Sequence, residues 1–249
     1  MMTGFWKLTW VETKVYMREP LGVISALGVP VLVFLVFGRR FPDARSAQAM
    51  DATNAPTLNV PILAALFIAI GAALSLVAII TIYREGGILK RLRATPLSPL
   101  TILGAHVFVK LIFTVLGLAL LVLAGRQFFP GAIDVNLWSF TLALLLGTLS
   151  ILSLGFVISS IVPTARFAQP LGSVILYPMI AISGLFFPID ALPLGWRIFA
   201  NLLPTTHAVG LMRGVWDGVG WGALWVNVFG LVAVFVVCSA VSTKAFRWE

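Results

Sequence analysis

The chain is organised around one basic stretch at residues 84–96, which reads REGGILKRLRATP. Five of its first ten residues are charged, in a chain in which charged residues make up 10% of the total. Long apolar runs flank it, at 52–83 before it and at 101–125 after it. A charged cluster that is tied at both ends to apolar segments of membrane length is typical of a cytoplasmic loop in a membrane protein.

The composition of the whole chain supports this reading. Of its 249 residues, 60% are hydrophobic, and the mean hydropathy is +1.04, whereas a soluble domain is usually about 45–50% apolar. We therefore expect an integral membrane protein, in which the surplus of seventeen basic over nine acidic residues marks cytoplasmic segments and does not indicate nucleic-acid binding. The lone Cys238 gives neither a disulfide framework nor a Cys-based metal site. The charged first 19 residues give no signal-peptide pattern.

Runs without charged residues predict where the chain crosses the membrane. Each run reaches about the 18 residues that a spanning helix needs, and a helix satisfies its own backbone in lipid. The prediction is a single all-α polytopic membrane domain over 1–249 with six transmembrane helices, at about 21–38, 59–82, 101–124, 136–162, 168–187 and 221–243. Only Lys110 interrupts the third span, and we expect its stem to extend to the cytoplasmic interface.

Counts of Lys and Arg predict the orientation. With both termini inside, ten basic residues fall on cytoplasmic segments and six on outer segments, and such an excess marks the cytoplasmic side. The pair Arg39-Arg40 directly after the first span points the other way. We expect a multi-pass protein of the cell (plasma) membrane with both termini in the cytoplasm.

Residues 3–19 combine charges with aromatic side chains. On a helix, Lys7, Lys14 and Arg18 fall within roughly 40° of one another. This pattern predicts an interfacial helix whose basic stripe faces lipid headgroups; an irregular lead-in is the alternative.

Residues 188–220, before the last predicted span, contain three prolines and an apolar helical face formed by Leu194, Ile198 and Leu202. Broken backbone at membrane depth has to be buried in protein. We therefore predict a re-entrant or interfacial pair of short helices on the outer side. Its candidate functional positions are Pro188, Pro193, Asn201, Pro204 and Arg213.

Within the basic stretch, Gly86-Gly87 is expected to break the helix that leaves the second span. Residues 88–95 can then form a short helix, which Pro96 ends because a proline disfavours helix at the residue before it. Its apolar edge suits a groove on a partner protein. A loop with a positive charge and no partner is the alternative.

The stretch resembles the loop after the second span in the membrane subunit of type-2 ABC exporters, where the pattern is approximately Arg-Glu-x-Gly-Thr-Leu-x-x-Leu-x-x-Thr-Pro. The matching residues are Arg84, Glu85, Gly87, Leu89, Leu92, Thr95 and Pro96. Ile88 stands where the family often has Thr. A late family pattern is matched by Pro188, Pro193, Trp196, Asn201, Pro204, Thr206 and Arg213. Together with length and span count, the resemblance covers essentially the whole chain.

The resemblance implies a non-catalytic permease subunit that pairs with a second permease copy, identical or related, and with a separate cytoplasmic ABC ATPase. The segment 84–96 would be the coupling helix, with Lys90, Arg91 and Arg93 facing the ATPase. ATP and Mg would bind the ATPase, with no cofactor on this chain. The chain contains no Gly-Lys dipeptide, which a phosphate-binding P-loop requires.

Other functions are less well supported by the residues. A channel or ion-coupled carrier generally has an ionisable residue in mid-membrane, and all nine acidic residues lie outside the predicted span cores. The sequence has no motif that is typical of a membrane enzyme, and the two histidines, His106 and His207, are expected to form local hydrogen bonds. Within the exporter family, the sparse polar residues of the spans favour an apolar or amphipathic solute such as a drug, an antibiotic or a lipid, as in multidrug exporters. Export of polysaccharide is the alternative.

Overall fold

A computed structural model of the chain describes residues 2–18, 20–38, 59–88, 99–128, 135–162, 164–186 and 188–245. Every regular element within these residues is helical, as expected from the sequence. The α-helices are α1 (Met2–Met17), α2 (Pro20–Gly38), α3 (Val60–Glu85), α5 (Pro99–Phe128), α6 (Leu137–Ile161), α7 (Ala165–Ile182), α8 (Leu194–Leu202), α9 (Pro204–Trp216) and α10 (Trp225–Ala245). Two short 3-10 helices are η1 (Ile189–Ala191) and η2 (Trp221–Ala223).

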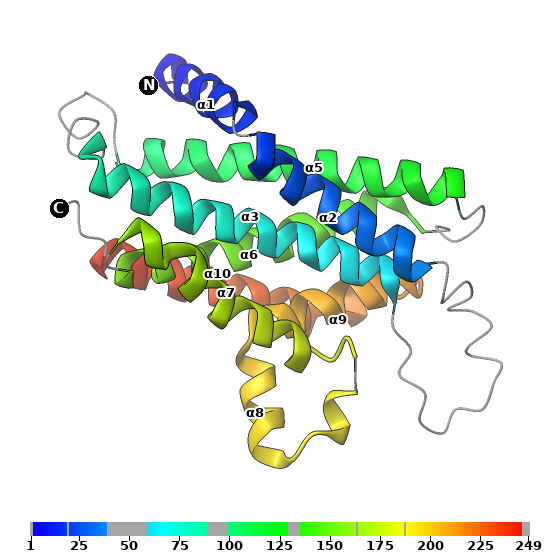
Figure 1. Ribbon diagram of the computed structural model, residues 1–249. Helices are drawn as coiled ribbons and strands as arrows, with labels where there is room; N and C mark the ends of the chain where they lie inside the picture. The colour runs from blue at the N-terminus through cyan, green and yellow to red at the C-terminus, as the bar shows by residue number, and fades with distance from the viewer. Residues whose placement is uncertain are drawn as a thin grey trace.

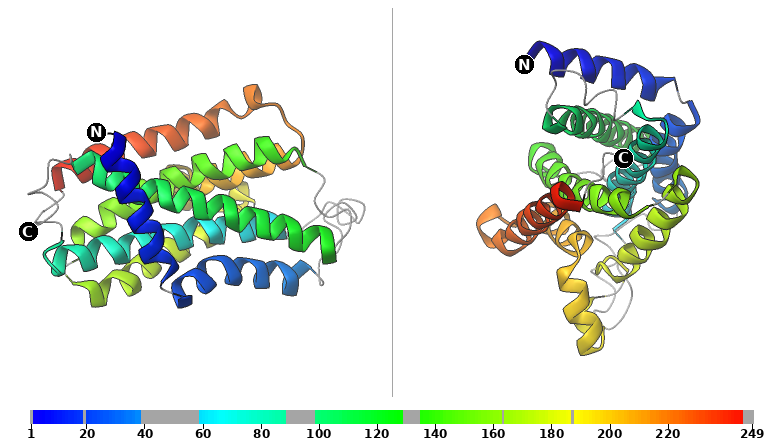
Figure 2. Two further views of the ribbon diagram at one scale, coloured as in Figure 1. Left: turned by 90° about the horizontal axis from the view of Figure 1, so that it is seen from above. Right: turned by 90° about the vertical axis from the view of Figure 1, so that its left-hand side faces the viewer.

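Five of the described helices are long and apolar enough to cross a membrane. They are α3, α5, α6, α7 and α10, and the described apolar part of α2, Ala26–Phe37, is shorter. Figure 1 shows the long helices side by side along one axis, with the N-terminus, the end of α3 and the end of α10 at the same end of the bundle. In contrast, α1 crosses α5 (Figure 2, left view), on which it packs.

Helix α3 is the centre of the bundle. It packs against α2, α5, α6 and α7, and most of its side chains are buried, including Ile62, Leu66, Leu76 and Ile80. Only the face that carries Phe67, Ser75 and Ile82 stays partly exposed. Apolar side chains of a membrane helix can face either lipid or protein, so it is the packing against four neighbouring helices that places α3 at the centre. Helices α2, α5, α6 and α7 cover most of α3, whereas α10 packs on α6 and α9 and exposes its own outer face, as at Phe229.

Small residues allow the neighbouring helices to approach α3 and one another closely. A Cβ atom at Gly155 of α6 would lie 3.4 Å from the carbonyl oxygen of Ala73, and a Cβ at Gly147 would lie 3.0 Å from the Cβ of Ala208 in α9. Since lipid gives little hydrophobic drive for association, membrane helices rely on such close packing.

Asparagine residues fix where two of the spans begin. The side-chain oxygen of Asn59 accepts a hydrogen bond from the N–H of Ile62 (3.1 Å), and that of Asn136 accepts one from the N–H of Ser139 (3.3 Å). Asparagine is among the strongest N-cap residues, because it satisfies a donor that has no partner within the helix.

The segment before α10 forms two short helices, α8 and α9, that differ sharply in burial. Helix α7 ends at Ile182, before Gly184, whose φ of +82° favours glycine. Helix α8 then leaves the bundle sideways (Figures 1 and 2) and exposes Leu194, Ile198 and Leu202, whereas α9 packs back onto α6 and α10.

A largely apolar cavity of about 600 Å³ lies where α8 and α9 approach α7 and α10, and its lining includes Phe199, Leu203, Val234 and Cys238.

The contact between α6 and α9 gives a test of the packing. Replacing Gly147 with Val forces a side chain against Ala208, and overpacking of this kind costs about 1–3 kcal/mol. We expect Gly147→Val to lower the midpoint of thermal unfolding in nanodiscs. Gly195→Val is the matched control, because no described atom lies within 4 Å of a Cβ at Gly195. Equal midpoints for the two variants would contradict the close approach of α6 and α9.

Candidate functional site at the end of α3

The last turn of α3 carries the first two residues of the basic stretch, Arg84 and Glu85. Gly86 is the cap residue of α3 and its N–H still donates to the carbonyl of Ile82 (2.9 Å), so the helix breaks after it. Gly87 follows with a φ of +67°, a left-handed conformation that glycine adopts without steric cost. The predicted helix break at Gly86-Gly87 is confirmed.

Arg84 ties the end of α3 to the end of α6. Its guanidinium donates one hydrogen bond to the carbonyl of Ser159 (3.1 Å) and another to the carbonyl of Val162. The last carbonyl groups of a helix have no partner within it, and positive charge is favoured at this end of the helix dipole. Arg84 therefore supplies both a donor and the right charge to the C-terminus of α6.

Glu85 ties the end of α3 to the start of α7. Its Oε1 accepts a hydrogen bond from the N–H of Ala165 (2.8 Å), the first residue of α7. A carboxylate at a helix N-terminus satisfies a donor without a partner and is favoured by the dipole. Two successive residues of α3 thus hold both sides of the turn between α6 and α7, which we call the α6–α7 junction (residues 159–165).

The remaining predicted coupling residues cannot be placed in this arrangement. Leu89, Lys90, Arg91, Leu92, Arg93, Thr95 and Pro96 lie outside the described residues. Gly87 and Ile88 are described and directly follow the junction contacts.

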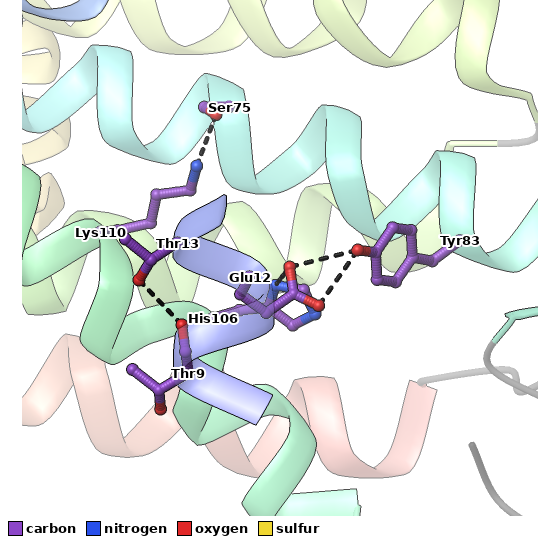
Figure 3. Close-up of polar contacts among 7 residues, drawn as sticks. All are labelled: Thr9, Glu12, Thr13, Ser75, Tyr83, His106 and Lys110. Atoms are coloured by element: carbon purple, nitrogen blue, oxygen red, sulfur yellow. Dashed lines mark hydrogen bonds and ion pairs between the residues drawn. The ribbon is translucent and has the colours of Figure 1, made fainter. Parts of the chain in front are cut away.

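A second cluster of polar residues lies beside the contacts of Arg84 and Glu85, and it was not predicted from the sequence. Figure 3 shows Glu12 of α1 between Tyr83 of α3 and His106 of α5. The hydroxyl of Tyr83 lies 3.0 and 3.2 Å from the two carboxylate oxygens of Glu12, and His106 Nδ1 lies 3.3 Å from Glu12 Oε2. Glu12 is 6% exposed and His106 2%. We call these three residues the Glu12 cluster.

Burial raises the pKa of the Glu12 carboxyl above its ordinary value. The hydrogen bond from Tyr83 and the ammonium of Lys110 act in the opposite direction.

Lys110 corrects one expectation from the sequence. Its side chain is 4% exposed and does not reach the interface: Nζ donates to Ser75 Oγ of α3 (2.7 Å) and lies 3.7 Å from the centre of the Tyr16 ring. A hydroxyl and an aromatic face offer the ammonium a polar environment inside the bundle, so the prediction that its stem extends to the interface was wrong. Lys110, Ser75 and Glu12 line a small cavity of about 60 Å³.

One signal in the sequence could have revealed the Glu12 cluster. Thr9, Glu12 and Tyr16 recur at i, i+3 and i+7 and are all buried in α1, a spacing that marks one helical face. The basic residues of the opposite face, Lys7 and Lys14, are exposed.

The predicted functional residues of segment 188–220 make a separate set of hydrogen bonds. His207 Nε2 pairs with the carbonyl of Asn201 (2.9 Å), and His207 Nδ1 lies 3.4 Å from Asn227 Oδ1. The guanidinium of Arg213 donates to the carbonyl of Leu185 at 3.5 Å. Pro188 and Pro193 precede η1 and α8, and Pro204 is the first residue of α9, where the missing N–H of a proline costs nothing.

The bundle of apolar helices defines a multi-pass membrane protein. A model of the ABC-2 type transporter family matches residues 3–216, so the chain belongs to that family of membrane permeases, as the resemblance indicated.

Part of the chain is also similar to proteins named Nodulation protein J: 29% identical over 99 residues in Rhizobium leguminosarum bv. viciae, 27% over 99 residues in R. leguminosarum bv. trifolii, and 38% over 63 residues in Bradyrhizobium diazoefficiens. The matches cover 40%, 40% and 25% of this chain and 38%, 38% and 24% of those proteins.

Removing the Arg84 guanidinium tests the junction. We expect Arg84→Ala to speed amide hydrogen exchange in the last turn of α6, because the carbonyls of Ser159 and Val162 lose a charged donor worth about 1 kcal/mol at a partly exposed site. Hydrogen exchange followed by mass spectrometry measures this. The control is Arg166→Ala, which removes the same charge from an exposed position one residue beyond the junction. Similar exchange in both variants would contradict the role of Arg84.

Proposed function

We propose that this chain is the permease subunit of an ATP-driven exporter. A separate cytoplasmic ABC ATPase, which holds ATP and Mg, binds the segment 84–96, and a second permease copy completes the transport path. Nucleotide binding moves the helix at 88–95 as a rigid lever and rocks the bundle between two states. The solute is apolar or amphipathic and leaves the cytoplasm or the inner leaflet.

The contacts of Arg84 and Glu85 carry this proposal. They bind the root of the basic stretch to three helices at once, α3, α6 and α7. Force applied to the stretch is therefore distributed over several spans, as a coupling element requires. A loop whose only role is to carry positive charge needs no such attachment.

The exposed residues of α1, α2 and α8 support insertion into a membrane and pairing with a second copy. We take α2 as the first of six spans, since the run 20–38 has no charged residue. The outward face of α1 exposes Trp6, Trp10 and Lys14, the residue types favoured at a membrane surface, which supports an interfacial helix on anionic lipid and cytoplasmic termini. The apolar face of α8 suits a position on the outer side, within lipid or against the second copy.

A groove between α2, α3 and α7 supports an amphipathic solute. It has a volume of about 240 Å³, and its lining combines apolar residues such as Pro30 and Phe67 with Ser75, Gln169 and Tyr177. A mixed surface of this kind offers hydrogen bonds to one part of a solute and apolar contact to another.

The polysaccharide alternative rests on the aromatic residues of the same groove. The rings of Phe67 and Tyr177 lie 6.4 Å apart, and a sugar ring can stack on such faces while Gln169 binds its hydroxyl groups. A channel or carrier that works without nucleotide is the third possibility.

Charge reversal in the basic stretch tests the coupling role. We expect the double variant Arg91→Glu and Arg93→Glu to insert normally but to lose its ATPase, because like charges would face the acidic partner surface. Purification from the native membrane in mild detergent, with mass spectrometry of stoichiometric partners, measures the loss.

The matched control reverses Arg126 and Arg197, which changes the net charge equally away from the basic stretch. Wild-type protein that purifies without any P-loop ATPase, even after crosslinking, would contradict the exporter and favour a channel or carrier. Retention of the ATPase by the Arg91/Arg93 variant would exclude those two residues from the interface.

The groove allows the solute classes to be separated. In proteoliposomes containing the permease and its ATPase, we expect ATP-dependent movement of a rhodamine dye, an amphipathic probe, to exceed that of a fluorescent oligosaccharide. Tyr177→Ala should reduce dye transport several-fold, since it removes both a ring and a hydroxyl from the groove. Val174→Ala, at an exposed position on the same helix and outside the groove lining, is the control. Preferential movement of the oligosaccharide would favour the polysaccharide alternative.

A further inference from the structure

We infer that Glu12 is a positioning residue for coupling: it fastens α1 to the last turn of α3, so that α1 moves with the coupling end of the permease. This inference rests on the proposed function. It concerns a side chain outside the basic stretch and on a helix that precedes all the spans.

The burial of Glu12 is the first observation. A carboxylate removed from water is costly unless hydrogen bonds compensate for the lost hydration. Lys7 and Lys14 of the same helix stay exposed, and Glu12 alone among the charged residues of the described part of α1 points into the bundle. There it meets the hydroxyl of Tyr83 and the ring of His106 (Figure 3). The cost of burial is therefore offset only while α1 is docked against both α3 and α5.

The second observation is how α1 is otherwise held. Its described packing is on α5, through the rings of Phe5 and Trp6 against Phe108 (5.8 and 5.7 Å) and of Tyr16 against Phe113 (4.4 Å), and on α2. These contacts attach α1 to its neighbours by apolar surface. The hydrogen bond from Tyr83 to Glu12 adds a directed link to α3.

The third observation is the position of Tyr83 in the chain. It immediately precedes Arg84 and Glu85, in the same helical turn of α3. Tyr83 bonds to α1 on one side, while Arg84 and Glu85 bond to the α6–α7 junction on the other. Because one turn of helix is rigid, a displacement of the segment that follows Glu85 reaches α1 and the junction together.

Lys110 strengthens this arrangement from α5. Its ammonium bonds to Ser75, lies over the ring of Tyr16 and stabilises the negative charge of Glu12. The small cavity beside these groups has room for a bound water molecule with polar partners. The end of α1 is thus held by a polar network that spans α1, α3 and α5.

The first experiment uses the permease alone in nanodiscs, so it does not depend on an ATPase. We expect Glu12→Ala and Tyr83→Phe each to raise the amide exchange rates of α1 by about tenfold, the effect of losing a hydrogen bond to a charged group. Exchange in α6 and α9 should not change. Glu12→Gln should restore most of the protection, because its amide oxygen still accepts from Tyr83. Val11→Ala is the matched control, at an exposed neighbouring position.

If Glu12→Ala and Val11→Ala exchange alike, or if Glu12→Gln fails to restore protection, the positioning role is overturned.

The second experiment adds the co-purified ATPase and traps the complex with ATP and vanadate. We expect trapping to change exchange in the last turns of α3 and in α1 together in wild type and in Glu12→Gln, but in α3 alone in Glu12→Ala.

A wild-type response in α3 that does not extend to α1 would overturn the inference and leave the proposed function standing. Absence of a response in both helices would count against the proposed function as well.

Discussion

The packing of α3 among its neighbours is the constraint on which the rest of the structure depends. Most of its side chains are buried, and only the face that carries Phe67, Ser75 and Ile82 stays partly exposed. Because lipid gives little hydrophobic drive for helices to associate, α3 is held among its neighbours by close packing of side chains. Ala73 and Leu74 of α3 meet Gly155 and Gly172 of α6 and α7 at distances that leave little room for a larger residue. The positions of the covering helices therefore follow from where α3 and its neighbours carry small residues.

Charged groups near the end of α3 lie where the apolar packing stops. Arg84 and Glu85 use the unpaired backbone groups of α6 and α7 as partners, while Glu12 and Lys110 find hydroxyl and aromatic partners between helices. In each case the charge is satisfied by a different element of the bundle. Polar side chains that join separate elements in this way fix their relative positions more strictly than apolar contact alone.

The sequence predicted the elements that local patterns determine and missed those that depend on tertiary contact. The charge-free runs located the apolar helices that begin after Asn59 and Asn136, and the break at Gly86-Gly87 was correct, since each depends on a few adjacent residues. The predicted position of the Lys110 side chain at the interface was wrong, because its partners Ser75 and Tyr16 are distant in the chain. Orientation in the membrane and the roles of the residues after Ile88 stay predictions.

The docking of α1 has a consequence for how the protein is made. Glu12 is synthesised 71 residues before its partner Tyr83, and His106 follows later still. During synthesis α1 therefore has no docking site until the third apolar helix, α5, has entered the membrane, and until then its carboxylate stays in water. Helix α1 therefore leaves the ribosome before its partners, and its docking requires that α3 and α5 are already in place.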